Sequence, residues 1–307
     1  MKAIQYKTYG GVEVIEQVDI PIPSVQNEND VLIQVKAAGV NPIDMKIRMG
    51  VMKETRPVGL PFIPGGEASG IIVAVGRKVS QFKVGDAVIA FTRKNAYAAY
   101  VTANENLVVL KPNGLSFIEA ASIGVNIGTA QSVLFTEGRL EKGQKVLIQG
   151  GAGAAGGAMV QMARAAGAYV IATASGKGVA LAKSLGANEV FDYKLQDVAS
   201  IVKGVDLVAD TAGGNAQEKL FQTVKAGGKL LSIATPPSQE LANKYNITAR
   251  FVASDISSQT VKNGMALIHA GTFIPVVSKT FKLEEAALAQ NFLTAGGVNG
   301  KVVLVVA

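Results

Sequence analysis

The stretch Gly150-Gly151-Ala152-Gly153-Ala154-Ala155-Gly156 decides the fold of this chain. It follows an apolar run at residues 145–149 and leads into a helical stretch at residues 157–166. Small residues between a strand and a helix leave backbone N–H groups open at the helix N-terminus, where a pyrophosphate group binds. The position of the loop therefore predicts a dinucleotide-binding site, and a purely structural glycine turn is the alternative.

The residues around this loop predict a doubly wound α/β domain that spans residues 124–270. Short apolar runs alternate with helical stretches, which is the βαβ pattern of a parallel sheet. The expected strands are residues 145–149, 169–173, 189–191, 205–209 and 229–233.

The flanking segments, residues 1–123 and 271–307, are expected to form a second, β-rich domain. They contain one helical stretch at residues 283–293 and strand-like runs between Gly, Asp and Asn turns, at residues 31–37, 70–76, 83–90, 97–101 and 301–306. Strands spaced in this way predict a barrel or a sandwich. With 307 residues, of which 49% are hydrophobic, the chain is large enough for two domains.

The residues after the second strand of the predicted parallel sheet indicate which dinucleotide binds. An NAD-specific site usually places an acidic side chain there, on the ribose hydroxyls, but residues 142–188 contain no Asp or Glu. Instead, Ala174, Ser175 and Lys177 stand where a 2′-phosphate would arrive, and a lysine attracts that phosphate as a point charge. We therefore predict NADPH rather than NADH; the alternative is that Lys177 is an ordinary solvated lysine.

The composition excludes several kinds of chemistry. The chain has no cysteine and one histidine, His269, so disulfides, thiolate nucleophiles and cysteine-based metal sites are excluded. Its net charge of +7 is dispersed, without the basic block typical of a nucleic-acid-binding arm. Residues 1–7 lack the apolar core of a signal peptide, and we find no run of the roughly 18 apolar residues that a membrane span needs. We expect a cytoplasmic protein.

Further motifs occur in order along nearly the whole chain. They include Asn41-Pro42-Ile43-Asp44, Gly65-Gly66-Glu67, Gly85-Asp86, the glycine loop and Gly300-Lys301-Val302-Val303-Leu304. Together they resemble the zinc-free quinone oxidoreductase branch of the medium-chain dehydrogenase/reductase superfamily. The resemblance implies a GroES-like β-rich catalytic domain interrupted by a Rossmann domain, with the active site in the cleft between them. It also implies a homodimer.

The resemblance bears on metal binding as well. Zinc-dependent alcohol dehydrogenases of this superfamily place a cysteine at the position of Asn41 and a histidine at that of Gly66, and these ligands are absent here. His269 has the pattern of a surface or helix-end histidine. We therefore predict no metal site. Without a Lewis acid, reduction of an electron-poor acceptor is favoured over alcohol oxidation.

The predicted catalytic residues are Asn41, Asp44 and Thr129. A quinone or a conjugated enone that accepts a hydride at carbon moves charge onto its oxygen, and the Asn41 amide can donate a hydrogen bond to that oxygen. Asn-Pro is also a turn signal, so a structural Asn41 is the alternative. We interpret Asp44 as an orienter of the loop. Thr129 resembles the family's threonine at the nicotinamide carboxamide, with helix capping as the alternative.

The predicted cofactor-binding residues come from the glycine loop and from strand ends. Tyr193 resembles the family's tyrosine near the adenosine phosphate, and packing beside a strand end is its alternative. Tyr97 and Tyr100 lie in a stretch similar to a family motif whose first glycines are replaced by Asn95 and Ala96, which leaves their role open. The full set is Gly150, Gly151, Gly153, Ala154, Ala155, Gly156, Ala174, Ser175, Lys177, Tyr193, Thr211, Ile233, Ala234, Thr235, Phe251 and Val252.

These observations predict an NADPH-dependent enzyme that transfers hydride to quinones without a metal. An NADPH-dependent reductase of α,β-unsaturated carbonyls, such as enones and 2-alkenals, is the nearest alternative, because it shares the fold and the cofactor. A non-catalytic RNA-binding or structural relative is more remote, since the chain has no aromatic-basic cluster of the kind that binds single strands.

Overall fold

The computed structural model describes residues 1–254, 262, 266–268, 270–271 and 273–307, and the chain divides into two compact units. The terminal unit joins Met1–Val125 to Pro275–Ala307, and the central unit spans Asn126–Ile274. His269, expected on the surface or at a helix end, lies outside the described residues. None of the helices in the described part of the chain has the length and apolar character that crossing a membrane requires.

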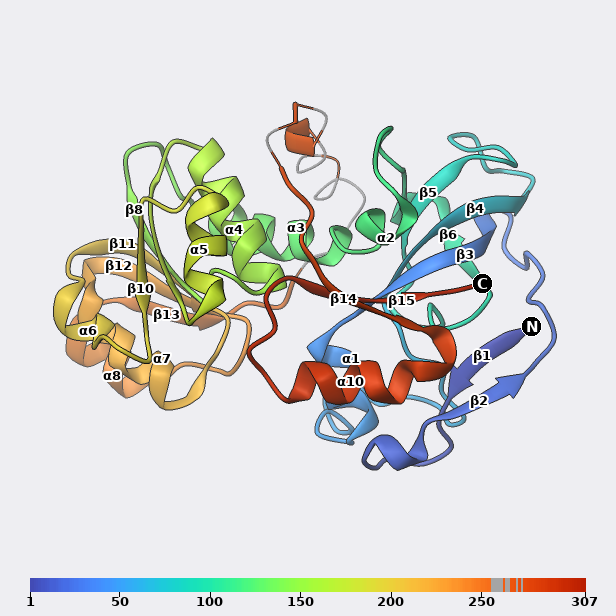
Figure 1. Cartoon of the computed structure of the whole chain (residues 1–307), viewed down its shortest axis with the longest axis horizontal. Helices are drawn as coiled ribbons and strands as arrows, with labels where there is room; N and C mark the ends of the chain where they lie inside the picture. Colours follow the sequence, from blue (N-terminus) through green and yellow to red (C-terminus); the bar gives the residue numbers. More distant parts are fainter. Residues whose placement is uncertain (255–261, 263–265, 269, 272) are drawn as a thin grey trace. The chain divides into compact units, whose positions relative to one another are not determined.

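The central unit is built on a six-stranded parallel sheet (Figure 1). Its order is β10-β9-β8-β11-β12-β13, so the first strand, β8, lies in the middle and the chain moves outwards from it in both directions. The strands are β8 (Lys145–Gln149), β9 (Tyr169–Ala174), β10 (Glu189–Asp192), β11 (Val205–Asp210), β12 (Val224–Ser232) and β13 (Thr248–Phe251). This is the order of the doubly wound dinucleotide-binding fold, so the predicted α/β class is confirmed.

Helices connect the parallel strands and cover both faces of this sheet. Right-handed crossovers that run in opposite directions along a sheet place their helices on opposite faces. In Figure 1, α4 and α5 accordingly lie on one side of the strands, and α7 and α8 lie on the other. The helices are α3 (Gly124–Gln131), a π-helical segment (Ser132–Glu137), α4 (Ala154–Ala165), α5 (Lys177–Ser184), α6 (Val198–Ile201), α7 (Gly214–Leu220), η4 (Phe221–Thr223) and α8 (Gln239–Tyr245).

The terminal unit contains a seven-stranded, mainly antiparallel sheet and a separate two-stranded sheet. The larger sheet has the order β14-β15-β3-β4-β5-β7, and β6 also pairs with β3. The strands are β1 (Lys2–Gln5), β2 (Glu16–Asp19), β3 (Asp30–Val40), β4 (Glu67–Val75), β5 (Ala87–Phe91), β6 (Tyr100–Asn104), β7 (Val108–Leu110), β14 (Val277–Lys282) and β15 (Lys301–Val305). The helices are η1 (Val12–Val14), α1 (Pro42–Arg48), η2 (Glu105–Leu107), α2 (Phe117–Ala120), η5 (Leu283–Glu285) and α10 (Ala286–Thr294).

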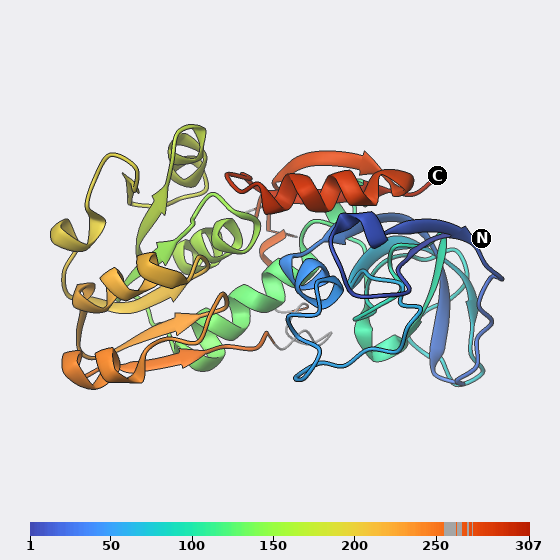
Figure 2. The ribbon, with the colours of Figure 1, turned by 90° about the horizontal axis from the view of Figure 1, so that it is seen from below.

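The C-terminal strand β15 completes the sheet formed by the N-terminal part of the chain. It pairs with β3 antiparallel, and Val302 stands opposite Val40. α10 packs against β14 and β15 (Figure 2). This register places Lys301 at the end of β3, where Asn41 leads into α1.

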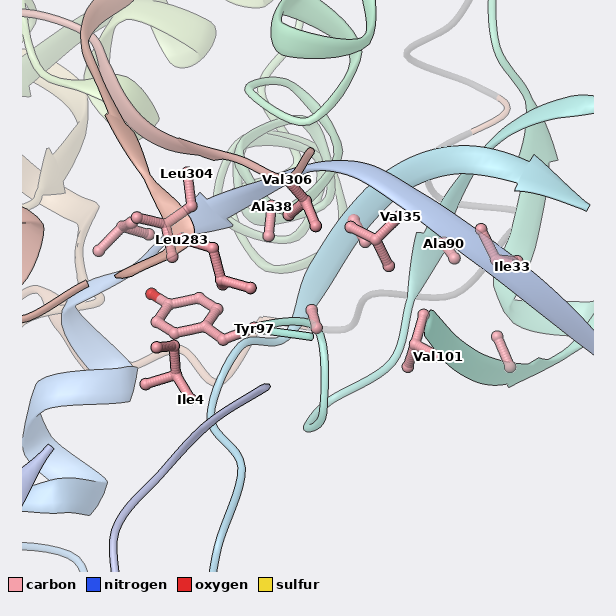
Figure 3. Close-up of a cluster of buried hydrophobic side chains, with 14 of the residues drawn as sticks. Ile4, Ile33, Val35, Ala38, Ala90, Tyr97, Val101, Leu283, Leu304 and Val306 are labelled. Atoms are coloured by element: carbon pink, nitrogen blue, oxygen red, sulfur yellow. The ribbon is translucent and has the colours of Figure 1, made fainter. Parts of the chain in front are cut away.

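The Tyr97 ring lies in the buried core of the terminal unit (Figure 3). It packs in one cluster with Ile4 of β1 and Leu283 of η5, so both ends of the chain contribute to this core. The strand expected at residues 97–101 begins only at Tyr100. Tyr97 instead lies in the preceding loop, where its N–H donates to the Pro64 carbonyl oxygen at 3.1 Å.

Candidate functional site

The glycine loop between β8 and α4 is packed too tightly for side chains. Gly150 has a φ of +76°, and a Cβ on Gly156 would lie 2.1 Å from the Gly150 carbonyl oxygen. A Cβ on Gly151 would lie 2.7 Å from the Cβ of Ala172 in β9. Glycine at these three positions therefore lets the loop fold closely against β8 and β9.

The N-terminus of α4 presents open backbone donors. Gly153 is its N-cap residue, and the Gly153 carbonyl oxygen accepts from the Gly157 N–H at 2.7 Å. Within the described part of the chain, the N–H groups of Ala154, Ala155 and Gly156 have no acceptor. First-turn N–H groups and the helix dipole together favour a bound anion. The loop therefore fits the pyrophosphate of a dinucleotide.

Ser175, Lys177 and Tyr193 lie at the carboxyl ends of the neighbouring strands β9 and β10. The Tyr193 N–H donates to the Ala174 carbonyl oxygen at 3.1 Å, and Ser175 Oγ donates to Tyr193 Oη at 3.1 Å. Lys177 is exposed as the first residue of α5, and its ammonium group has no ion-pair partner among the described residues. Two hydroxyl groups and an unpaired cation suit a phosphate group.

Asp192, an acidic residue to which the sequence analysis assigned no role, lies at the same carboxyl ends of β9 and β10. Asp192 Oδ2 accepts from the Gly176 N–H at 3.0 Å, and Oδ1 accepts from the Lys194 N–H at 2.9 Å. Both carboxylate oxygens therefore hold the turns that follow β9 and β10. A search for an acid directly after β9 misses Asp192, because it reaches this turn through the pairing of β9 with β10.

The buried carboxylate of Asp210 ties together the ends of β11 and β12. Its Oδ1 accepts from the N–H groups of Ala212 and Gly213, both at 2.9 Å. Its Oδ2 accepts from Ser232 Oγ at 2.6 Å and from Gln217 Nε2 at 2.8 Å. These four bonds fix the loops that follow both strands.

Four of the predicted cofactor-binding residues lie in these two loops. Thr211 Oγ1 donates to the last carbonyl group of β8 at 2.7 Å. The Ile233 N–H donates to the last carbonyl group of β11 at 3.0 Å. The N–H groups of Ala234 and Thr235 donate to Ser232 Oγ at 3.1 and 3.3 Å. The structure thus brings these residues together at the carboxyl ends of β8, β11 and β12.

Thr129 lies inside α3, so the alternative explanation as a helix cap is wrong. The buried Thr129 Oγ1 is 2.9 Å from Ser254 Oγ, which follows β13. Phe251 ends β13 with 48% of its surface exposed, whereas Val252 is buried and its N–H donates to the Ser232 carbonyl oxygen at 2.8 Å. The segment after β13 therefore contacts both β12 and α3.

Asn41 leads into α1 in the terminal unit, and only 5% of its surface is exposed. Its backbone N–H donates to Asp44 Oδ2 at 2.9 Å, and the Asp44 N–H donates to the Asn41 carbonyl oxygen at 3.0 Å. The side-chain Oδ1 accepts from the Lys301 ammonium group at 2.6 Å, and Nδ2 donates to Glu67 Oε1 at 3.1 Å. Both ends of the amide are therefore held by charged side chains to which the sequence assigned no role.

Asp44 is buried at the start of the same helix. Tyr97 Oη donates to Asp44 Oδ2 at 2.9 Å, which gives the tyrosine a structural role. Burial raises the pKa of Asp44 to about 6, although the hydrogen bonds from Asn41 and Tyr97 lower it. This geometry supports Asp44 as the group that orients the helix start.

Known proteins resemble this chain over nearly its whole length. The alcohol dehydrogenase GroES-like domain family matches residues 27–142, and the zinc-binding dehydrogenase family matches residues 185–304. Quinone oxidoreductase from Rattus norvegicus is 32% identical over 323 residues, which cover 99% of this chain and 97% of the relative. The chloroplastic NADPH-dependent alkenal/one oxidoreductase from Arabidopsis thaliana is 33% identical over 322 residues, which cover 99% of this chain and 79% of the relative. The solved quinone oxidoreductase from Coxiella burnetii has a TM-score of 0.90 at 31% identity, covering 100% of this chain and 99% of that one.

The chain therefore belongs to the medium-chain dehydrogenase/reductase superfamily, in its zinc-free quinone oxidoreductase branch. It is an NAD(P)H-dependent oxidoreductase, and the predicted GroES-like and Rossmann folds are confirmed. One matching family is named for zinc, but this chain has no cysteine. Its described residues contain no group of three His, Asp or Glu side chains that could hold a metal ion.

Proposed function

We propose that this enzyme transfers hydride from NADPH to quinones and that no metal ion takes part. The observation that carries the cofactor assignment is the group of Ser175, Tyr193 and the unpaired Lys177 where a 2′-phosphate would arrive. The Arabidopsis thaliana relative, named as NADPH-dependent, supports it. The two relatives named quinone oxidoreductase, which align over nearly the full length, support the acceptor class.

Different residues of the central unit would bind the pyrophosphate, the adenosine half and the nicotinamide half of the cofactor. The open N–H groups of Ala154, Ala155 and Gly156 would hold the pyrophosphate. Ser175, Lys177 and Tyr193 would hold the adenosine half, since β9 and β10 lie on one side of β8. The loops after β11 and β12, on the other side of β8, would hold the nicotinamide half. When bound, NADPH supplies the hydride.

Asn41 would stabilise the charge that develops on the acceptor. As hydride adds to a ring carbon of the quinone that is conjugated to a carbonyl group, an electron pair moves onto that carbonyl oxygen, which takes up a proton from solvent. Tautomerisation, in which that ring carbon loses a proton to solvent and the second carbonyl oxygen gains one, completes the hydroquinone. The amide N–H of Asn41 would donate a hydrogen bond to the first carbonyl oxygen and keep its own proton. Asp44 positions Asn41 through the backbone bonds at the start of α1.

The test compares two classes of acceptor. Initial rates of NADPH oxidation are measured with chelator-treated protein, a simple para-quinone and a 2-alkenal. We expect kcat/KM to be about tenfold or more higher for the quinone. A faster reaction with the alkenal would establish instead the reductase of α,β-unsaturated carbonyls, which the name of the Arabidopsis thaliana relative favours. No reaction with either acceptor, while NADPH binds, would contradict both functions.

The homodimer that the resemblance implies and the cytoplasmic location expected from the sequence stay predictions. Light scattering on the eluted protein would measure the oligomeric state.

A further inference from the structure

The terminal unit contains an ion pair whose two side chains are both buried. Lys301 Nζ lies 2.5 Å from Glu67 Oε1, and the two side chains are 2% and 0% exposed. In the other ion pairs of the described residues, at least one side chain is largely open to solvent. Lys301 belongs to β15 and Glu67 to β4, so the pair depends on the tertiary fold.

Asn41 completes a ring of hydrogen bonds with this pair. Lys301 Nζ donates both to Asn41 Oδ1, at 2.6 Å, and to Glu67 Oε1. Asn41 Nδ2 donates to the same Glu67 oxygen at 3.1 Å. An ammonium group only donates and a carboxylate only accepts, so the ring permits one orientation of the Asn41 amide.

The surrounding backbone holds Glu67 in place. Its second oxygen, Oε2, accepts from the Val125 N–H at 2.8 Å. A Cβ on Gly39 would lie 2.4 Å from Glu67 Oε1, so glycine at this position lets the carboxylate approach β3. Nδ2 of Asn41 makes a second, longer contact of 3.4 Å with the Gly39 carbonyl oxygen. The N–H that faces Gly39 is therefore the more weakly held of the two.

Stability alone does not account for two buried charges. Desolvation of a buried ion pair offsets most of the attraction between the charges, and apolar residues of similar volume often stabilise a protein equally well. A charged donor does have a specific effect on an amide, because it draws electron density towards the amide oxygen. Hydrogen bonds in such a chain polarise one another, so the amide N–H becomes a stronger donor.

We propose that Lys301 and Glu67 are positioning residues that orient the Asn41 amide and that Lys301 also polarises it for donation to the acceptor oxygen. This inference rests on the proposed role of Asn41. The charge of Lys301 acts through the amide, and the proton that the acceptor oxygen takes up comes from solvent.

The test removes both charges while it keeps the shape of the site. Glu67→Gln/Lys301→Met leaves no unpaired charge, whereas Lys301→Met alone would leave a buried carboxylate without its partner. We expect the double variant to bind NADPH with an unchanged Kd and to have a kcat about tenfold or more below that of the wild type. Lys225→Met/Asp206→Asn is the matched control, because it removes an ion pair at the amino ends of β11 and β12 and should leave kcat unchanged.

A double-mutant cycle with Asn41→Ala separates the two proposals. If Lys301 and Glu67 act through Asn41, adding Glu67→Gln/Lys301→Met to Asn41→Ala lowers kcat by less than about twofold below that of Asn41→Ala alone, a non-additive result. A double variant with the kcat of the wild type, while Asn41→Ala alone is slow, would overturn only the positioning role. An Asn41→Ala variant with normal kcat would overturn the role of Asn41 and the positioning role with it.

A second variant covers the case in which the double variant does not fold. Lys301→Arg retains the charge but changes the geometry of the donors. It should retain the melting temperature to within a few degrees and lower kcat without changing the Kd for NADPH. Normal kcat in this variant would contradict the requirement for an aligned ammonium group.

Discussion

Asn41 combines the start of a helix with the role that we propose for its side chain in the reaction. Its backbone bonds to Asp44 begin α1, while its side-chain amide is held by Lys301 and Glu67. The turn signal in Asn-Pro and the polar amide are therefore not exclusive explanations. The backbone of Asn41 forms the turn, and its side-chain amide can still have the role that we propose in the reaction.

Replacing Asn41 by alanine should separate chemistry from cofactor binding. Asn41→Ala removes the amide that we propose as the donor to the acceptor oxygen and changes no predicted cofactor-binding residue. We expect kcat to fall about 100-fold, with the Kd for NADPH within about twofold of the wild type. Steady-state kinetics and titration of NADPH fluorescence measure the two quantities. A normal kcat would show that the amide is structural.

Lys177 should determine the preference for NADPH. Because its exposed ammonium group has no partner among the described residues, Lys177→Ala should raise KM for NADPH about tenfold and leave KM for NADH unchanged. Lys183→Ala is the control, since Lys183 lies on the same helix and donates to the Asn188 carbonyl oxygen. Equal effects of Lys177→Ala on both cofactors would contradict a 2′-phosphate contact.

Asp44 should make stability depend on pH. The pKa of Asp44 is about 6 in the folded protein, above the ordinary value of 3.8. Its contribution to the free energy of unfolding is therefore fully present below pH 3.8 and is lost as the pH rises through about 6. Asp44→Asn keeps an oxygen for the Asn41 and Tyr97 donors but carries no charge. Its free energy of unfolding relative to the wild type should therefore rise by about 2 kcal/mol between about pH 4 and pH 7. Urea unfolding at several pH values measures it, and a constant difference would show an unshifted Asp44.

At the scale of elements, the glycine loop and the start of α4 pack so closely that Gly156 has no room for a side chain. Gly156→Ala would place a Cβ 2.1 Å from the Gly150 carbonyl oxygen, so the loop must shift. We expect the Kd for NADPH to rise about tenfold and the melting temperature to fall by several degrees. Gly157→Ala is the matched control, because its Cβ would lie 3.0 Å from the end of the Leu185 side chain and 3.6 Å from the Gly151 carbonyl oxygen, which is an ordinary contact distance. Calorimetry and NADPH titration measure both effects, and equal behaviour of the two variants would contradict the tight-loop account.

The elements that the sequence predicts best are those with one dominant physical signal. β8 has the predicted bounds, residues 145–149, because a central parallel strand is apolar on both faces. β13 and β14 lie at the edges of their sheets, where several exposed polar side chains hide the strand pattern. α1 begins at Pro42, directly after Asn41, and has only seven residues, so the Asn-Pro pair at its start has the pattern of a turn.

At the scale of the whole molecule, the two parts of the candidate site differ in how far apart their residues lie in the sequence. The glycine loop is a continuous segment, so its shape and its binding chemistry could be predicted from spacing. The contact of Lys301 with Asn41 spans 260 positions and exists only because β15 pairs with β3. No local pattern indicates such a contact, which is why Lys301 and Glu67 were missed.

The measurement that tests the central claim most directly is the rate of reduction of one para-quinone by chelator-treated protein, with NADPH and with NADH. We expect rapid reduction that the chelator does not affect and a kcat/KM about tenfold or more higher for NADPH than for NADH. Equal or faster reaction with NADH, or activity that the chelator abolishes, would contradict this claim.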